Sequence, residues 1–216
     1  MNCRSRTVQL AGVTLAFALA GCSATQPVRV LTKGERRWIA SVGGPMLPNH
    51  VVTKIIPYTN VGMMWGVRDN LTASANVHVL AAAFGIAGVD MGAARRFHAQ
   101  SGRVPEITGQ AQLYGFVGSG GARVYPSITG TASWAQGTRG LIYGGGALTV
   151  RPSGGIALVG TPHIGWQHDV GRRLVLQLES KWMAANIDMH RGLFEGENSI
   201  GGRGGLALQL GMQVRR

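Results

Sequence analysis

The stretch that decides the fold reads Leu174-Val-Leu-Gln-Leu-Glu-Ser-Lys-Trp182. The even-numbered positions 174, 176, 178 and 182 hold large apolar residues. Of the four odd-numbered positions, three hold the polar residues Gln177, Glu179 and Lys181. Successive side chains of a β-strand point to opposite faces, so this period of two predicts a strand with one apolar and one polar face. A helix would instead spread the same polar residues around its surface.

The same alternation recurs over residues 71–81, 107–117 and 206–214. Turn-forming residues separate the runs, namely Asp69-Asn70, Ser101-Gly102, Gly118-Ser-Gly-Gly121, Gln136-Gly137, Pro152-Ser-Gly-Gly155, Val170-Gly171 and Glu197-Asn198. Short turns join successive strands in antiparallel, up-and-down order. We therefore predict an all-β fold, an antiparallel up-and-down β-barrel of about ten strands (8–12), formed by residues 35–216.

Residues 70–89 test this interpretation, because they contain no charged Lys, Arg, Asp or Glu and resemble a membrane helix in composition. Polar residues occupy every second position from Thr72 to His78, which favours a strand. The apolar remainder is shorter than the roughly 20 residues that a spanning helix needs. We expect two strands that turn near Phe84-Gly85, so that the spacing from Gly88 to Gly92 is not a helix-packing motif.

The N-terminus has the layout of a secretory signal peptide over residues 1–21. Arg4 and Arg6 precede an apolar stretch that runs from Leu10 to Ala20. The apolar region of such signals spans roughly 7–15 residues, and this one is too short to cross a membrane as a helix. We therefore expect an exported protein.

The junction reads Leu19-Ala20-Gly21-Cys22 and resembles the lipobox of bacterial lipoproteins. The resemblance implies cleavage before Cys22, attachment of membrane lipid to the Cys22 thiol, and a lipidated tether over residues 22–34. Ser23 in place of Asp implies the outer membrane of a Gram-negative bacterium as the destination. The alternative is an ordinary secretory signal that is cut elsewhere, with Cys22 unmodified.

The chain is strongly basic, with a net charge of +12 that falls to about +10 once the signal peptide is removed. Most of its arginines stand at or beside predicted turns: Arg68, Arg95, Arg96, Arg103, Arg123, Arg139, Arg151, Arg172, Arg173, Arg191 and Arg203. No short segment concentrates them, which argues against a nucleic-acid-binding element. Anionic lipid headgroups or lipopolysaccharide phosphates are the expected partners, with a simple solvated rim as the alternative.

The polar strand faces indicate which side of the barrel meets water. Their middle positions hold mainly Thr, Ser, Gln, Gly and Ala, whereas a water-exposed surface carries roughly 25–35% charged residues. This composition suits a narrow lumen, and the candidate lumen residues are Gln110, Gln112, Gln177, Glu179 and Lys181. The alternative is a lipid-tethered periplasmic barrel, a lipocalin-like carrier that holds an apolar or lipid ligand inside.

Trp65, Trp134 and Trp166 each precede a predicted turn, as expected for aromatic rings at a membrane interface. The segments Gly62–Leu71 and Ser180–Trp182 resemble the hairpin ends of small outer-membrane barrels. The resemblance is architectural and names no activity. For a small barrel of this kind we expect a structural or interaction role, or a narrow pore. The chain departs from that pattern at its C-terminus, which ends in two arginines rather than an aromatic residue.

The sequence contains no recognisable catalytic constellation. His163 and His168 are five residues apart, so a strand directs them to opposite faces and they cannot share a metal ion. No HExxH, GxSxG or phosphate-loop motif occurs. We expect no enzyme activity, metal or cofactor. The enzymatic alternative depends on the loop residues Asp188, His190 and Glu195.

Overall fold

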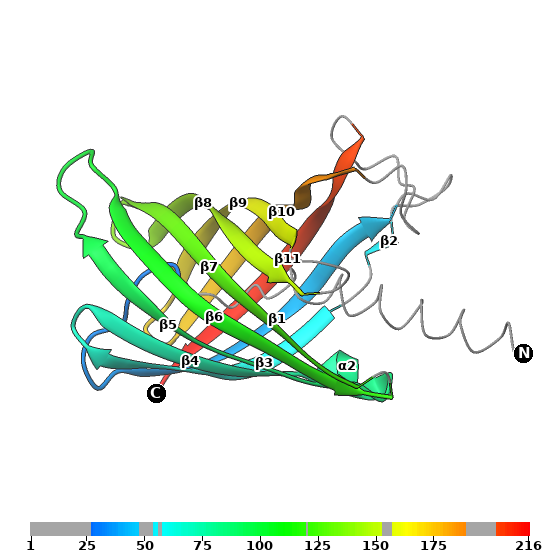
Figure 1. Cartoon of the computed structure of the whole chain (residues 1–216). Coiled ribbons are helices and arrows are strands. Elements are labelled where there is room, and N and C mark those ends of the chain that lie inside the picture. The colour runs from blue at the N-terminus through cyan, green and yellow to red at the C-terminus, as the bar shows by residue number, and fades with distance from the viewer. Residues whose placement is uncertain (1–26, 48–53, 56–57, 120, 153–156, 189–201) are drawn as a thin grey trace, which may run out of the picture.

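The structure, a computed structural model, describes residues 27–47, 54–55, 58–119, 121–152, 157–188 and 202–216. Ten long antiparallel strands form a closed barrel (Figure 1). They are β1 (Arg36–Leu47), β3 (Tyr58–Arg68), β4 (Leu71–His78), β5 (Ala87–His98), β6 (Glu106–Gly118), β7 (Gly121–Gln136), β8 (Gly140–Arg151), β9 (Ala157–Val170), β10 (Leu174–Asp188) and β11 (Arg203–Arg215). The two-residue strand β2 (Lys54–Ile55) pairs only with the end of β1.

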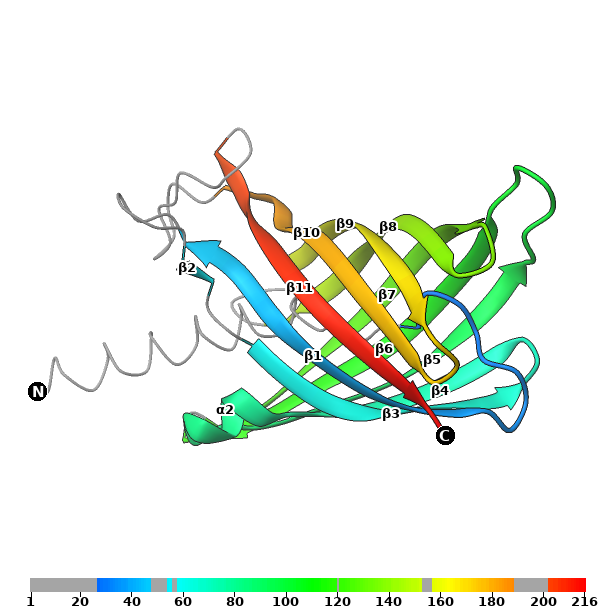
Figure 2. The ribbon, with the colours of Figure 1, turned by 180° about the vertical axis from the view of Figure 1, so that it is seen from behind.

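The barrel closes between its first and last strands. β11 pairs with β1 in antiparallel register, with Trp38 opposite Val214 and Val42 opposite Leu210. Figure 2 shows these two strands side by side, and every other strand pairs with its neighbour along the chain. Closure leaves no long strand with an unpaired edge. The predicted up-and-down barrel of about ten strands is confirmed.

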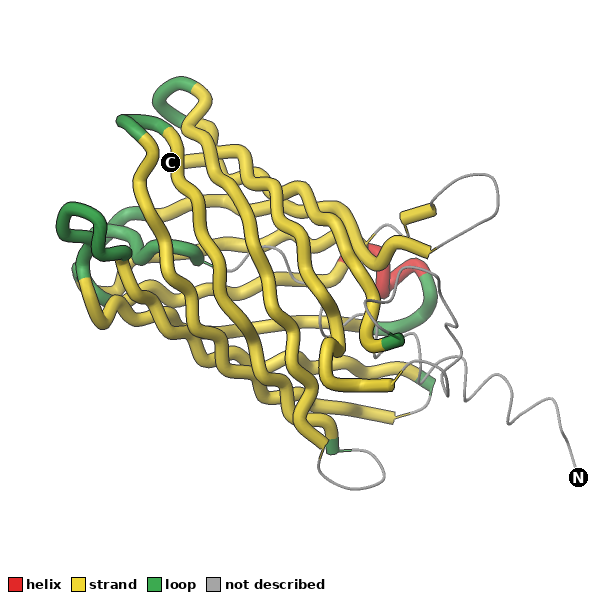
Figure 3. Tube along the Cα trace, turned by 90° about the horizontal axis from the view of Figure 1, so that it is seen from above, coloured by secondary structure: helices red, strands yellow, loops and turns green. Residues whose placement is uncertain are grey.

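The two ends of the barrel differ in their connections (Figure 3). One end, called here the turn end, holds the β3–β4, β5–β6, β7–β8 and β9–β10 turns together with the start of β1 and the end of β11. The opposite end, called the loop end, holds the other connections. At the turn end Gly137 and Gly171 adopt φ values of +62° and +69°, which glycine accepts without strain. The turn signals at 153–155 and 197–198 lie outside the described residues.

The alternation predicted for residues 71–81 ends earlier than expected. β4 stops at His78, and residues Val79–Ala83 form the short helix α2. The chain must reverse direction here, and a helical turn satisfies backbone groups that leave the sheet. The turn near Phe84-Gly85 is confirmed, with Gly85 at φ +72°. Gly88 and Gly92 both lie in strand β5, as the strand interpretation requires.

The strands turn their polar faces inward and their apolar faces outward. On β10, Gln177, Glu179 and Lys181 are buried, whereas the side chain of Leu178 is 44% exposed. The exposed fractions of Ile164 on β9 and Leu210 on β11 are 67% and 51%. A soluble barrel would have the opposite arrangement, so this is the geometry of a membrane barrel, in which apolar residues contact lipid.

Glycines make room for large side chains in the lumen. A Cβ atom on Gly165 of β9 would collide with the ring of Tyr143, which reaches inward from the neighbouring strand β8. Tyr143 is 1% exposed. The absence of a side chain on one strand therefore lets a buried aromatic ring cover the next strand.

Candidate functional site in the lumen and at its mouth

One half of the lumen contains a hydrogen-bonded polar group centred on Tyr143. The Tyr143 hydroxyl donates to Glu179 Oε2 at 2.8 Å and accepts from Gln177 Nε2 at 2.7 Å. Lys181 Nζ lies 3.1 Å from Glu179 Oε1, and both side chains are 5% exposed. Gln167 Nε2 donates to Gln177 Oε1 at 2.9 Å. The buried charges of Glu179 and Lys181 therefore pair with each other, and Glu179 also accepts a hydrogen bond from Tyr143. A buried ion pair needs such additional hydrogen bonds to offset its loss of contact with water.

A second polar group lies on β4, β5 and β6. Asp90 Oδ1 accepts hydrogen bonds of 2.6 Å from both Asn76 Nδ2 and Gln112 Nε2. His78 Nε2 lies 3.0 Å from the other carboxylate oxygen of Asp90, and neither side chain has exposed surface. Gln110 Nε2 donates to Gln112 Oε1 at 3.2 Å. This group fixes one carboxylate inside the barrel through three neighbouring strands.

The structure places all five predicted lumen residues, Gln110, Gln112, Gln177, Glu179 and Lys181, inside the barrel. It divides them between the two polar groups rather than gathering them at one point. Tyr143 and Asp90 were not predicted as lumen residues. Tyr143 stands in a glycine-rich stretch that lacks clear alternation, and Asp90 follows the uncharged segment.

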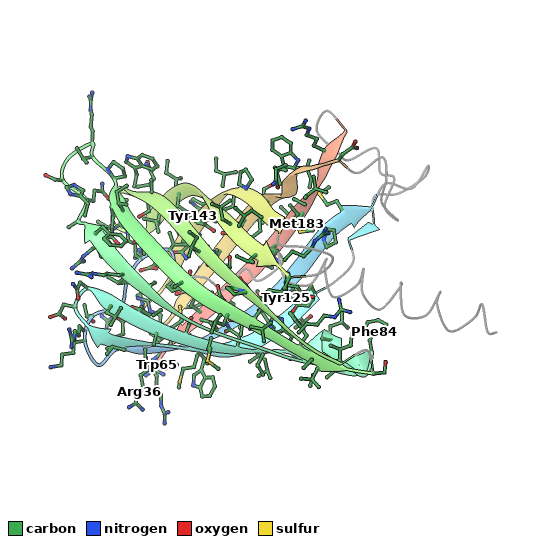
Figure 4. The ribbon with its side chains drawn as sticks, viewed as in Figure 1. Arg36, Trp65, Phe84, Tyr125, Tyr143 and Met183 are labelled. Atoms are coloured by element: carbon green, nitrogen blue, oxygen red, sulfur yellow. The ribbon has the colours of Figure 1, made fainter. Side chains whose placement is uncertain are left out.

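Aromatic residues fill the lumen toward the loop end. Tyr58, Tyr114, Phe116 and Tyr125 form a buried cluster with Ala81 of α2. The His78 ring lies 5.0 Å from that of Phe116 and 5.2 Å from that of Tyr58, measured between centroids. In Figure 4, Tyr125 and Met183 project into the barrel, and Met183 packs against this cluster.

Residues 27–34, called here the strap, cross the lumen at the turn end. Val28 is buried against Leu141 and Tyr143 on the inner face of β8. Leu31 is buried against Ile39 of β1 and Met64 of β3. In a ring of ten strands in this order, β8 lies opposite β3. The strap therefore spans the mouth from one wall to the other, so this part of the predicted tether is packed inside the barrel.

Polar contacts hold the strap in place. Arg29 Nε donates to Ser133 Oγ at 3.1 Å and lies 3.9 Å from Glu106 Oε2. Backbone bonds join Gly34 and Glu35 to Gly66 of β3, each at 2.9 Å. A Cβ atom on Gly66 would overlap the carbonyl oxygen of Thr32, so only glycine allows the strap to lie this close.

Glu35 follows the strap and pairs with Arg37 at the start of β1. Arg37 Nη2 lies 2.8 Å from Glu35 Oε1, and Thr32 Oγ1 donates to Glu35 Oε2 at 3.0 Å. Partial burial raises the pKa of Glu35, but the charge of Arg37 and the hydrogen bonds outweigh burial and bring that pKa below its ordinary value. The pair is thus ionised at neutral pH.

Cations crowd the turn end. Nine exposed Lys and Arg side chains there, called here the basic rim, form no ion pair with a described residue: Lys33, Arg36, Arg68, Arg95, Arg103, Arg139, Arg172, Arg173 and Arg216. Among the arginines predicted at turns, Arg96 also lies at this end, Arg123, Arg151 and Arg203 lie at the loop end, and Arg191 lies outside the described residues.

Aromatic side chains flank the outer apolar surface at both ends. Near the turn end lie the predicted Trp65, Trp134 and Trp166, joined by Trp38 and Phe97. Near the loop end lie Phe84 and Trp182. Figure 4 shows Trp65 on the outside of the barrel beside Arg36, with which it is in register. Aromatic residues at both ends of the outer apolar surface agree with a membrane barrel, whose aromatic residues lie at the two membrane interfaces.

The described residues offer little for catalysis or metal binding. No group of three His, Cys, Asp or Glu side chains among them is arranged to hold a metal ion. His163 points inward and His168 outward, as predicted. Asp188 lies at the end of β10, while His190 and Glu195 lie outside the described residues. No helix in this part of the chain is long and apolar enough to span a membrane.

No protein-family model matches the chain, and no curated protein matches it in sequence. Its fold resembles that of the translocator domain of autotransporter NalP from Neisseria meningitidis, with a TM-score of 0.51, 9% identity and 98% of both chains covered. Lower scores relate it to outer membrane protein OprG from Pseudomonas aeruginosa, at TM-score 0.34, 8% identity and coverage of 87% of this chain and 98% of that one. Ail, the attachment invasion locus protein of Yersinia pestis, matches at TM-score 0.29 and 9% identity, with 86% and 100% covered. The likeness to the NalP domain shows that the chain has the fold of an outer-membrane β-barrel.

Proposed function

We propose that this chain is a lipid-anchored β-barrel of a Gram-negative outer membrane, that its lumen is closed, and that it has a structural or interaction role. The strap carries this proposal, because Val28 and Leu31 pack against opposite walls at the mouth. Catalysis is not part of the proposal.

The closed lumen is supported from three levels of the barrel. At the turn end the strap packs on Tyr143, whose polar group extends through Glu179 and Lys181 toward the middle. Gln112 of the Asp90 group also lies in the middle, and His78 of that group contacts the aromatic cluster around Phe116 toward the loop end. Barrels of about eight strands are just wide enough for side chains to fill, and ten strands enclose only slightly more space. Hydrogen bonds also tie the side chains of the Tyr143 and Asp90 groups to one another.

Membrane insertion is supported by the outward apolar surface and by the aromatic residues at both of its ends. Both described termini of the barrel, Arg36 and Arg215, lie at the turn end, where three of the four connections have only two or three residues. Outer-membrane barrels have short periplasmic turns and longer extracellular loops. The turn end therefore faces the periplasm in this proposal, and the loop end faces outward from the cell.

The lipid anchor is supported by the resemblance of Leu19–Cys22 to a lipobox and by chain length. Val28 is six positions after Cys22, so the two residues are at most about 20 Å apart when the chain is extended. A lipid on Cys22 can therefore reach the leaflet at the turn end. Metabolic labelling with an alkyne analogue of palmitate tests the anchor: Cys22→Ala should abolish the label and Cys3→Ala, within the signal peptide, should not.

A narrow pore is the second candidate, and the continuous polar lining of the lumen favours it. A lipocalin-like carrier is disfavoured because the large apolar strand faces lie outside the barrel, whereas a carrier turns such faces inward around its ligand. Single-channel recordings of the full-length chain in planar bilayers separate the two remaining candidates. A closed barrel shows no sustained open-channel steps, whereas regular steps from the wild-type chain would establish the pore and reject the closed lumen.

A further inference from the structure

The two ends of the barrel carry very different charges. At the turn end, the strap, the strand ends and the turns together contain thirteen Lys and Arg residues. The same segments contain four carboxylates. Lys54, Arg123, Arg151 and Arg203 are the described cations near the loop end. The net positive charge of the described residues is therefore concentrated at one side of the apolar belt.

The carboxylates at the turn end do not neutralise the basic rim. Asp69 lies in the β3–β4 turn, accepts a hydrogen bond of 3.0 Å from the Lys33 backbone amide and is one carboxylate against nine rim cations. Glu35 is paired with Arg37, Asp169 with Arg215 at 2.6 Å, and Glu106 lies nearest Arg29. These three arginines line the mouth and are distinct from the rim. The rim cations remain exposed and repel one another, so an anionic partner would be attracted to the ring as a whole.

The basic rim is continuous with the membrane-facing surface. Arg36 is the register partner of Trp65, and the guanidinium of Arg95 lies 5.8 Å from the ring centroid of Phe97. Every hairpin at this end contributes at least one rim cation, including Arg68, Arg139 and Arg172. Tryptophan and phenylalanine at strand ends mark the depth of lipid headgroups. The guanidinium groups beside them therefore lie at the depth of lipid phosphates.

We infer that the basic rim binds the phosphate groups of anionic phospholipids in the membrane leaflet at the turn end. The choice of phospholipid over lipid A rests on the proposed outer-membrane placement, in which this end faces the periplasm and the phospholipid leaflet. Arginine suits the task because its planar fork can hold two phosphate oxygens at once. A ring of such sites would fix the depth and tilt of the barrel, and would select anionic over zwitterionic neighbours.

Native mass spectrometry of the full-length chain, released from detergent micelles, tests the inference directly. The chain is equilibrated with equal amounts of phosphatidylglycerol and phosphatidylethanolamine, and in a second arm with phosphatidylglycerol and lipid A. The rim variant is Arg68→Gln/Arg139→Gln/Arg172→Gln. Its charge-matched control at the loop end is Lys54→Gln/Arg123→Gln/Arg203→Gln. A heat-dependent gel shift verifies that each barrel is folded.

The wild-type chain and the control should retain phosphatidylglycerol about fivefold over phosphatidylethanolamine, and the rim variant should lose most of this preference. High salt should also weaken the preference of the wild-type chain, because it screens exposed charges, and this measurement needs no variant. Equal retention of the two phospholipids by the wild-type chain overturns the inference. Preference for lipid A that disappears in the rim variant overturns the choice of leaflet. Single-channel conductance is measured independently of lipid retention. A failure of the closed-lumen proposal can therefore be told apart from a failure of the inference about the basic rim.

Discussion

The backbone amide of Leu31 donates a hydrogen bond of 2.7 Å to Thr72 Oγ1, which joins the strap to the inner face of β4. Both residues are buried, so neither group can turn to bulk water instead. Thr72→Val keeps the shape of the side chain but leaves the Leu31 amide without its acceptor. We expect a loss of about 1–3 kcal/mol in the free energy of strap docking, seen as faster hydrogen exchange at Leu31. Thr161→Val on β9 should leave that exchange rate unchanged.

Gly66→Ala should displace the strap by steric overlap. The added Cβ meets the carbonyl of Thr32, which is backbone and cannot rotate away. We expect faster proteolysis within residues 27–34 while the barrel keeps its heat-dependent gel shift. Gly130→Ala is the matched control, because a Cβ there has open space around it. Equal protease sensitivity of the two variants would show that the strap does not depend on close approach to β3.

The Glu179–Lys181 pair should be costly to break. Lys181→Ala removes the cation that lies 3.1 Å from a buried carboxylate. Removing one member of a buried pair typically costs about 3–5 kcal/mol, because the remaining charge lacks compensation. Denaturant titration in lipid vesicles measures this loss. The comparison is Arg139→Ala in the basic rim, expected to change stability by less than about 0.5 kcal/mol.

Arginine on the outer surface should destabilise the barrel according to depth. Ile164 lies in the middle of β9 and is 67% exposed, whereas Val170 ends the same strand and is 44% exposed. Ile164→Arg should cost about 2–4 kcal/mol in vesicles, and Val170→Arg about 0–1 kcal/mol. Similar costs at the two positions would mean that this surface does not lie in a hydrocarbon layer.

The strap should loosen in acid. The pKa of Glu35 is lowered in the folded chain, so its ionised form contributes stability above the ordinary glutamate pKa, about 4.3. That contribution is lost as pH falls through the lower folded-state pKa. Limited proteolysis of the strap should therefore increase between about pH 5 and pH 3. Glu35→Gln should increase cleavage at neutral pH and reduce the dependence on pH.

The sequence predicted the barrel because period two is visible wherever one strand face is polar. Glu179 and Lys181 were recognised as lumen residues for this reason. Tyr143 was not, because three glycines follow it in the sequence, and glycine marks neither a polar nor an apolar face. The end of β4 was placed too late, since Val79 and Ala81 continue the alternation by chance while the backbone turns into α2.

Two features of the site depend on contacts between distant segments. Val28 and Leu31 belong to a short stretch without periodicity, which reads as a tether until its packing against opposite walls is known. The basic rim follows from topology, because alternate turns of an up-and-down barrel lie at the same end. Arg68, Arg139 and Arg172 occupy such alternate turns. The sequence predicted between about 8 and 12 strands, and without the exact number of strands between two turns they cannot be assigned to the same end.

Spin labels on single cysteines test the central claim, that the strands turn their apolar faces to lipid. In a chain with Cys3 and Cys22 replaced by serine, labels are placed through Ile164→Cys and Leu210→Cys outside the barrel, and through Gln177→Cys and Gln209→Cys inside. After reconstitution in vesicles, collision rates with oxygen, which concentrates in lipid, and with a water-soluble nickel complex are compared. The outer labels should collide frequently with oxygen and rarely with nickel, and the inner labels rarely with either. Frequent collisions between the nickel complex and the outer labels would contradict the account.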